Sequence, residues 1–282
     1  MEKFGVRVVA PLGGRLNQHW LVDLRGERLV LRLWWSKSPE DMDYELRLLT
    51  SISVLGWPVA PAVEGPVNLD GQFWCLFPYL PGDPPSVADR IAEQRARGRL
   101  LAQFHTDLEK LSGFGQRGDW QRCEKVLNDP TLERVLSKNE RKQPEETRIL
   151  RWHLERARQR VDGLKTQARP SIVIHGDFTP WNLLFKDGRL SGILDFEFAH
   201  LNHRVADFAL SWRGRHDEVV RAYDEVSPLD PEEWELLTPV WWAWLIGGAC
   251  KDLAQGILTH EWTIKHLLRR SPLMGQDSAE FR

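Results

Sequence analysis

The segment 173–197 places three oxygen-bearing side chains around one short predicted hairpin. It reads Val-Ile-His-Gly-Asp-Phe-Thr-Pro-Trp-Asn-Leu-Leu-Phe, then Lys-Asp-Gly-Arg, then Leu-Ser-Gly-Ile-Leu-Asp-Phe-Glu. Asp-Gly between two apolar runs is a strong signal for a β-hairpin. Because hairpin strands run antiparallel, we expect Asn182 and Asp195 side by side at the open end, with Asp177 just upstream in the same loop.

Two carboxylates and an amide oxygen are what phosphoryl transfer requires. Oxygen ligands suit Mg²⁺, and one carboxylate can accept the proton of a hydroxyl group. Taken singly, Asp177 is also suited to capping a helix, and Asp195 to ending a strand. Their occurrence together with Asn182 around one hairpin favours phosphoryl transfer.

The motif His-x-Asp-x-x-x-x-Asn, which ends at Asn182, followed by Ile-Leu-Asp-Phe-Glu resembles the aminoglycoside phosphotransferase and choline kinase-like family. These proteins are small-molecule relatives of the protein kinases. The resemblance implies that Asp177 is the catalytic carboxylate, which orients and deprotonates the acceptor hydroxyl. It also implies that Asn182 and Asp195 are the magnesium ligands.

Two further residues are implied to support the catalytic loop. His175 resembles the family histidine that braces this loop through hydrogen bonds, and Asp207 resembles the buried aspartate that binds the backbone of the loop. Phe196-Glu197 stands where protein kinases carry Phe-Gly, so a mobile, glycine-hinged activation segment is not implied. This departure, with the absence of an Ala-Pro-Glu segment, disfavours a protein kinase.

The resemblance implies an α+β fold, bilobal and protein kinase-like. Residues 1–80 are expected to form a nucleotide-binding N-lobe with an antiparallel sheet plus a helix. Residues 81–282 are expected to form a larger, mainly helical C-lobe with the catalytic loop and the acceptor site. Strands are predicted at 6–10, 19–24, 28–33 and 72–77. Helices are predicted after Ser38-Pro39, at 91–111, from Pro144 onward, and at 206–212, 217–226, 231–254 and 262–270.

In the predicted N-lobe, Gly13, Gly14 and Asn17 belong to a glycine-bearing turn between strands. Such a turn can lie over nucleotide phosphates, because its backbone approaches closely and offers N–H donors. Kinase-like folds also place a cationic strand residue on the α- and β-phosphates and pair it with a helix glutamate. Arg32 and Glu45 are the candidates here, with arginine in place of the usual lysine.

The remaining nucleotide contacts are assigned around the link between the lobes. Phe77-Pro78-Tyr79 resembles the connector whose backbone binds the adenine edge, and Phe77 and Tyr79 are assigned to the nucleotide site. Leu184 and Leu194, on the two strands of the hairpin, are assigned to the same site. Apolar side chains of this kind sandwich a purine ring.

Charge and cysteine content narrow the other possibilities. The formal net charge of −2 and the pI near 6.5 give no general attraction to nucleic acid or anionic membrane, so neither is expected as a partner. The three cysteines are far apart, which fits a reducing cytoplasm and no zinc site. The apolar run 239–250 is too short to span a bilayer and is expected to be a buried helix.

These observations predict a cytoplasmic phosphotransferase that uses ATP and Mg²⁺ to phosphorylate a hydroxyl group of a small molecule. The acceptor stays open. An aminoglycoside, homoserine, choline, a sugar or a macrolide all remain candidates, and the fourteen tryptophans permit an aromatic cage for an amine. From residue 199 onward acidic side chains moderately outnumber basic ones. A catalytically inactive nucleotide-binding module is the alternative from another class. The oligomeric state is not predicted.

Overall fold

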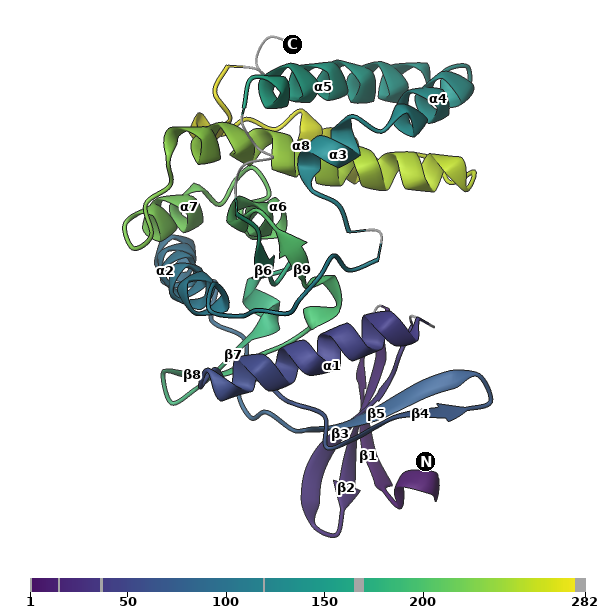
Figure 1. Ribbon diagram of the computed structural model, residues 1–282, viewed down its shortest axis with the longest axis vertical. Coiled ribbons are helices and arrows are strands. Elements are labelled where there is room, and N and C mark those ends of the chain that lie inside the picture. Colours follow the sequence, from purple (N-terminus) through teal and green to yellow (C-terminus); the bar gives the residue numbers. More distant parts are fainter. Residues whose placement is uncertain (1, 15, 36–37, 119, 165–169, 277–282) are drawn as a thin grey trace. The chain divides into compact units, whose positions relative to one another are not determined.

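The computed structural model describes residues 2–14, 16–35, 38–118, 120–164 and 170–276 (Figure 1). Contacts divide the chain into two compact units. The N-terminal unit comprises Met1–Pro85 and Pro180–Glu197, and the C-terminal unit comprises Ser86–Thr179 and Phe198–Arg282. The predicted lobes also include residues 1 and 277–282, which lie outside the described part of the chain.

The N-terminal unit is built on a five-stranded antiparallel sheet with the strand order β1-β2-β3-β5-β4. One face carries an apolar cluster that includes Val22, Leu29, Leu31 and Leu76, all 2% exposed or less. Side chains alternate between faces along a strand, so Arg32 points to the opposite face. The strands are β1 (Arg7–Gly13), β2 (Gln18–Leu24), β3 (Glu27–Leu33), β4 (Glu64–Leu69) and β5 (Gln72–Pro78).

Helix α1 (Pro39–Val54) lies on that opposite face of the sheet (Figure 1). It begins as the sequence predicts: the Ser38 side chain accepts a hydrogen bond from the backbone N–H of Asp41, and proline occupies the first helical position. The buried side of this helix includes Leu48 and Ile52, both of which are inaccessible to solvent. The helix thus lies over the second face of the sheet (Figure 1), and its Glu45 contacts Arg32 of β3.

The predicted hairpin is present as β7 (Leu183–Lys186) and β8 (Arg189–Ile193). Two links join it to the rest of the N-terminal unit. The backbone N–H of Ile193 donates to the carbonyl of Pro58 at 2.8 Å, and Asp83 and Phe185 exchange two backbone hydrogen bonds. The hairpin thus belongs to the N-terminal unit. In the sequence, however, it lies about a hundred residues after the lobe boundary predicted at residue 80.

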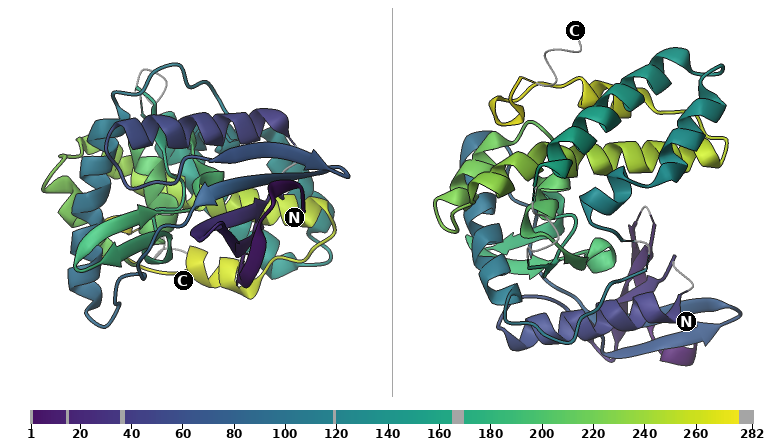
Figure 2. Two further views of the ribbon diagram at one scale, coloured as in Figure 1. Left: turned by 90° about the horizontal axis from the view of Figure 1, so that it is seen from below. Right: turned by 45° about the horizontal axis from the view of Figure 1, so that its top comes forward.

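The C-terminal unit is mainly helical, with one small sheet formed by β6 and β9. Helix α2 packs on α7, and α8 packs on α5, α3, α4 and α6; α5 lies beside α8 in the right-hand view of Figure 2. The elements are α2 (Arg90–Leu108), α3 (Cys123–Leu127), α4 (Pro130–Asn139), α5 (Pro144–Asp162), β6 (Ile172–Ile174), β9 (His200–Asn202), α6 (Phe208–Ser211), α7 (Asp217–Asp224), α8 (Pro231–Ala254) and α9 (Glu261–Leu267).

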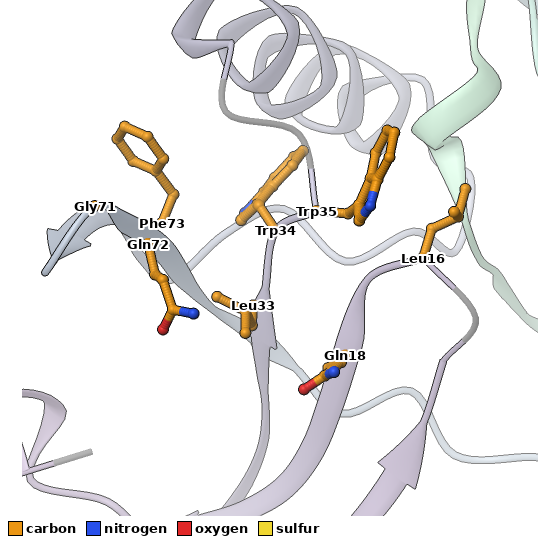
Figure 3. Close-up of a pocket in the computed structure, with 8 residues that line it drawn as sticks. All are labelled: Leu16, Gln18, Leu33, Trp34, Trp35, Gly71, Gln72 and Phe73. Atoms are coloured by element: carbon orange, nitrogen blue, oxygen red, sulfur yellow. The ribbon is translucent and has the colours of Figure 1, made fainter. Parts of the chain in front are cut away.

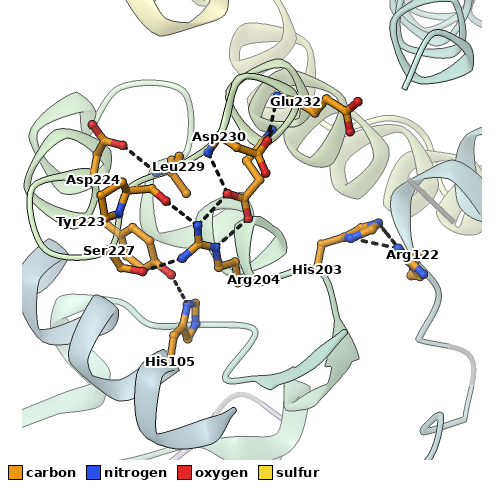
Figure 4. Close-up of polar contacts among 12 residues, drawn as sticks. His105, Arg122, His203, Arg204, Tyr223, Asp224, Ser227, Leu229, Asp230 and Glu232 are labelled. Atoms are coloured by element: carbon orange, nitrogen blue, oxygen red, sulfur yellow. Dashed lines mark hydrogen bonds and ion pairs between the residues drawn. The ribbon is translucent and has the colours of Figure 1, made fainter. Parts of the chain in front are cut away.

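Helix α8 starts at a capping box in which Asp230 and Glu233 satisfy each other's backbone N–H groups. Glu233 also binds Arg204 through two contacts of 2.6 Å, and Arg204 donates to Ser227 and to the carbonyl of Pro228 (Figure 4). These charge-assisted bonds fix the first turn of the longest helix in the described part of the chain. Among the described residues no helix is both long and apolar enough to cross a membrane.

The predicted fold class is confirmed, and so are most of its elements. The helix predicted at 231–254 has those bounds, and the hairpin predicted at 19–33 forms β2 and β3. Strand β4 was not predicted, because it contains the Gly65-Pro66 pair, which is rare within strands. Strand β9 and helices α3 and α4 were not predicted either; each is short.

Candidate active site

Asn182 and Asp195 lie together at the open end of the β7–β8 hairpin. Leu183 pairs with Ile193, and the backbone N–H of Leu194 donates to the carbonyl of Asn182 at 2.8 Å. Asn182 directly precedes Leu183, and Asp195 directly follows Leu194, so the two predicted magnesium ligands lie at the same end of the hairpin. Asp195 adopts φ = +65°, a left-handed conformation that is uncommon outside glycine and tends to occur at functional sites.

Asp177 belongs to the loop that follows β6 in the C-terminal unit, and the buried Asp207 holds the backbone of that loop. The two carboxylate oxygens of Asp207 accept hydrogen bonds from the backbone N–H groups of His175, at 2.9 Å, and Gly176, at 2.6 Å. The His175 ring nitrogen Nδ1 accepts from the N–H of Asp177 at 3.1 Å. These are the hydrogen bonds that the family resemblance implied for Asp207 and His175.

Asp207 is supported in turn by helices α2 and α7. His105 Nε2 lies 2.8 Å from an Asp207 oxygen, and His105 Nδ1 lies 2.9 Å from the Tyr223 hydroxyl (Figure 4). Burial raises the pKa of Asp207, but the hydrogen bonds from His105 and the loop outweigh it, so the pKa is lowered overall. The sequence indicated a packed role for His105 but not this contact, which joins residues 102 positions apart.

The carbonyl of Phe178, the residue after Asp177, is held from two other elements. Ser211 Oγ donates to it at 2.6 Å, and the buried Arg97 donates to it at 3.4 Å and to the carbonyl of Ser211 at 2.9 Å. Arg97 is paired with Glu93 at 2.6 Å. Sequence reasoning missed these residues, since no local pattern marks a contact from a side chain to a distant backbone carbonyl.

No residue type other than glycine fits at position 176 of the loop. Its φ is +84°, and a Cβ atom there would lie 2.4 Å from the carbonyl oxygen of Phe198. Side chains disfavour such a φ and cannot approach a backbone oxygen so closely. The conformation that presents Asp177 therefore requires glycine immediately before it.

In the N-terminal unit, Arg32 and Glu45 form the predicted ion pair. Arg32 Nη1 lies 2.5 Å from Glu45 Oε1, and the two residues are 6% and 1% exposed. The Arg32 guanidinium also lies 4.1 Å from the centre of the Trp34 ring. A buried pair of this kind is stable only while both partners are present.

Asn17 is engaged within the protein. Its side-chain Nδ2 donates to Glu197, and its Oδ1 accepts from the backbone N–H of Trp35 at 2.9 Å. The neighbouring Gly14 has φ = +133°, and a Cβ there would lie 1.8 Å from the Asn17 carbonyl oxygen. The end of the glycine turn is thus tied to the segment that follows Asp195.

His19 is a residue of this site that the sequence did not reveal. It pairs with Arg32 across β2 and β3, and its Nδ1 lies 3.2 Å from the Gly13 carbonyl. Burial, and then the charge of Arg32, lower the pKa of His19 to about 4, so the ring is neutral near pH 7. A register prediction that set His19 opposite Arg32 would have been the signal for it.

The other predicted nucleotide contacts occupy ordinary positions in the N-terminal unit. Phe77 is buried at the end of β5, Tyr79 is half-buried in the connector, Leu184 is buried on β7, and Leu194 follows β8. A pocket of this unit lies elsewhere, lined by residues such as Leu16, Trp34, Trp35 and Phe73 (Figure 3). None of the predicted nucleotide contacts lines it.

Oxygen donors for a metal ion are few among the described residues. No cluster of three His, Cys, Asp or Glu side chains is arranged there to hold an ion. One carboxylate and one amide oxygen, as Asp195 and Asn182 offer, nevertheless suit Mg²⁺, which usually keeps few protein ligands and takes the rest from phosphate and water. The donor chemistry at the hairpin therefore fits magnesium held jointly with a nucleotide.

The two units, with a five-stranded sheet and helix in one and a helical body in the other, define a kinase-like fold. A model of the phosphotransferase enzyme family matches residues 7–235, and the chain belongs to that family. The family membership confirms the predicted class of enzyme, an ATP-dependent phosphotransferase with an alcohol group as acceptor. It leaves the catalytically inactive module without support.

Homoserine kinases resemble the chain in sequence, and solved kinase structures share its fold. Homoserine kinases of Phenylobacterium zucineum and Caulobacter sp. (strain K31) are each 27% identical over 77% of this chain, and the alignments cover 70% and 71% of those proteins. A ternary complex of an aminoglycoside phosphotransferase APH(4)-Ia mutant with ADP and hygromycin B has a TM-score of 0.70 at 15% identity, over 94% of both chains. A microcompartment-associated aminopropanol kinase has a TM-score of 0.67 at 16% identity, over 97% of this chain and 90% of the other.

Proposed function

We propose that this chain transfers the γ-phosphoryl group of ATP to a hydroxyl group of a small molecule, with Asp177 as the proton acceptor. The observation that carries the proposal is the anchoring of the loop around Asp177. Asp207 fixes the two N–H groups that precede it, and Ser211 fixes the carbonyl that follows it. Catalysis of phosphoryl transfer depends on alignment, and a loop held on both sides of the carboxylate provides it.

In the proposed step, the acceptor oxygen forms a bond to the γ-phosphorus, and the bond from that phosphorus to the β–γ bridging oxygen breaks. The electron pair of the broken bond leaves with ADP. The proton of the hydroxyl passes to the Asp177 carboxylate. Little covalent help is needed, because the transition state is loose and its charge is spread over the phosphoryl oxygens.

Asn182 and Asp195 are proposed to hold Mg²⁺, which neutralises phosphate charge when bound. Arg32, kept in place by Glu45, is proposed to contact the phosphates, and the backbone of Gly13 and Gly14 to cover them. Phe77, Tyr79, Leu184 and Leu194 are proposed to enclose the base.

Asn17 is better understood as a positioning residue, because both polar atoms of its side chain are engaged with Glu197 and Trp35.

Residues 1–80 are proposed as the nucleotide-binding lobe, with the hairpin added to it, and the rest of 81–282 as the lobe for the catalytic loop and the acceptor. A cytoplasmic location is proposed from the three cysteines, all of which are free and buried. The partners are ATP and the acceptor, with no role proposed for nucleic acid or membrane.

The class of acceptor has one favoured alternative to an aminoglycoside. The curated relatives are homoserine kinases, which phosphorylate a far smaller molecule than an aminoglycoside. At 27% identity this favours a metabolic kinase as a second candidate function. The two candidates are separated by measuring ADP release with each acceptor in turn.

The decisive variant for the proposal is Asp177→Asn, assayed with an acceptor that the wild-type protein phosphorylates. Loss of the proton acceptor with retention of shape should reduce kcat by at least about a hundredfold, in line with the usual contribution of general base catalysis. The dissociation constant for ATP with Mg²⁺ should stay within about twofold, because Asp177 is not proposed to bind nucleotide. Undiminished kcat removes Asp177 from its proposed role.

A further inference from the structure

Cationic side chains collect beside Asp177 within the C-terminal unit. Ser211, which donates to the Phe178 carbonyl, is followed two positions later by Arg213, whose Nε donates to the Leu210 carbonyl at 2.9 Å. Burial lowers the pKa of Arg213, and the charge of Asp177 counteracts that effect. The first guanidinium is therefore an electrostatic neighbour of the proposed proton acceptor.

A second and a third guanidinium reach the same region through Asp217. One Asp217 oxygen accepts hydrogen bonds from Trp212 Nε1 at 2.8 Å and from Ser271 Oγ at 2.5 Å. These bonds bring the segment after α9, with Arg269, against the segment before α7, with Arg215. Burial, and then the charge of Arg215, lower the pKa of Arg269.

Among the residues that the structure describes, no carboxylate is in direct contact with the guanidinium of Arg215 or Arg269. In the described part of the chain neither Arg215 nor Arg269 forms an ion pair, and the Nη1 nitrogen of Arg269 is buried without a hydrogen-bond partner. One oxygen of Asp217 accepts hydrogen bonds from two neutral donors. A buried guanidinium nitrogen without an acceptor carries a desolvation cost that a bound anion relieves.

Aromatic rings border the arginines. The half-exposed Trp262 stacks on His266 with ring centres 3.9 Å apart, and Trp241 lies 6.0 Å from His266. The position of a Gly214 Cβ is 3.1 Å from Trp241 Nε1, a buried donor without a partner among the described residues. The segment between Arg213 and Arg215 therefore packs directly on this aromatic group.

The pKa of His266 shows that the three arginine side chains lie close to one another. Its pKa is lowered to about 4, first by burial, while the Trp262 carbonyl opposes the shift and the charges of Arg269, Arg215 and Arg213 add to it. One imidazole is thus exposed to the field of all three guanidiniums. Like charges gathered in one region repel a polycationic ligand and attract an anion.

We propose that the acceptor of this enzyme is an anionic alcohol, whose oxyanion group is bound by Arg213, Arg215 and Arg269 while its hydroxyl faces Asp177. The inference rests on the proposed function, since it assigns the substrate class of the same reaction. The planar guanidinium fork binds carboxylate and phosphate oxygens in pairs. The arrangement favours an anionic acceptor over a polycationic one such as an aminoglycoside.

The first test needs no catalysis and no knowledge of the carbon skeleton. The melting temperature of the full chain is measured with increasing inorganic phosphate, at constant ionic strength set by chloride. We expect wild type and Arg270→Gln, a neighbouring exposed arginine outside the cluster, to be stabilised alike. Arg215→Gln and Arg269→Gln should lose most of the shift. An equal shift in all four proteins, or none in wild type, overturns the proposal.

The second test compares acceptors that share a polyol skeleton and differ in charge. ADP release is measured with gluconate, glucose 6-phosphate, glucose and glucosamine. We expect the two anions to give a kcat/KM at least tenfold above glucose, and Arg215→Gln to raise their KM about tenfold with kcat unchanged. A preference for glucosamine overturns the anionic assignment. If ATP with magnesium fails to stabilise the protein while phosphate does, the proposed function fails and the anion site stands.

Discussion

The Asn17 amide donates a hydrogen bond to Glu197, two positions beyond the proposed magnesium ligand Asp195. The same side chain accepts from the backbone N–H of Trp35, two residues after β3 ends. One buried amide therefore joins the glycine turn, the strand that carries Arg32 and the segment after the hairpin. This connection makes Asn17 a test of how the N-terminal unit organises nucleotide binding.

Asn17→Asp should weaken ATP binding and lower stability together. The new carboxylate cannot donate to Glu197 and repels it, which should cost roughly 2–3 kcal/mol for a buried polar contact. We expect the KM for ATP to rise about tenfold, and kcat to fall less. Gln18→Ala, at the exposed neighbouring position, is the control and should leave both quantities unchanged. Equal behaviour of the two variants contradicts the role of this contact.

Asp195→Asn should abolish the dependence of nucleotide binding on magnesium. The substitution keeps the size of the side chain but removes the charge that attracts the cation. Isothermal titration with ATP is the measurement, with and without Mg²⁺. In wild type magnesium should tighten binding by more than about tenfold, whereas in the variant the two titrations should agree. A persistent magnesium effect refutes the ligand assignment.

The Arg32–Glu45 pair allows stability to be separated from phosphate binding. Arg32→Met leaves Glu45 buried without its partner and should cost about 3–5 kcal/mol in urea unfolding. The double variant Arg32→Met with Glu45→Leu removes both charges and should recover most of that stability. It should still bind ATP weakly, because the phosphate contact is gone. Normal ATP affinity in the double variant would assign the pair a purely structural role.

Acid should destabilise the C-terminal unit through Asp207. Its pKa is lowered in the folded protein, so its contribution to stability is fully present above the unfolded pKa near 3.9 and is lost as pH falls through the folded value. We expect the unfolding free energy of wild type to decline below about pH 4. Asp207→Asn should be less stable at pH 7 and should show a shallower decline. Parallel curves for the two proteins count against this carboxylate as a source of the acid sensitivity.

We expect the substitution of glycine by alanine to change stability in opposite directions at two positions. Gly176→Ala forces a side chain into a left-handed conformation and against the Phe198 carbonyl, and it should lower stability by at least about 3 kcal/mol. Gly248→Ala adds a methyl group to open space inside α8 and should raise stability by about 0.5–1 kcal/mol. Thermal unfolding of both variants is sufficient to compare them. A tolerated Gly176→Ala shows that the loop can shift.

Local patterns predicted the parts of the site that are local. The hairpin follows from Asp-Gly between apolar runs, and it brings Asn182 next to Asp195. The Arg32–Glu45 pair follows from a strand and the helix after it. The hydrogen bonds from Ser211 and Arg97 to the Phe178 carbonyl could not be predicted. They join residues that are 33 and 81 positions apart, and such contacts produce no periodic pattern in the sequence.

The local distribution of charge could not be predicted for a related reason. A balance summed over residues 199–282 is mildly acidic, but the sum counts solvated helix faces and the neighbourhood of Asp177 equally. The tertiary fold selects Arg213, Arg215 and Arg269 for one region and leaves most of the acidic side chains elsewhere. The sign of a local field depends on which side chains are neighbours in space, and composition does not contain that information.

The contact of His105 with both Asp207 and Tyr223 has a consequence for how this enzyme tolerates change. A phenol on α7 and an imidazole on α2 stand behind the carboxylate that shapes the reactive loop. Substituting either ring should slow turnover without touching ATP or acceptor. Inactivating mutations selected at random will therefore fall on helices remote from chemistry, and a survey confined to substrate contacts will underestimate how many positions the activity depends on.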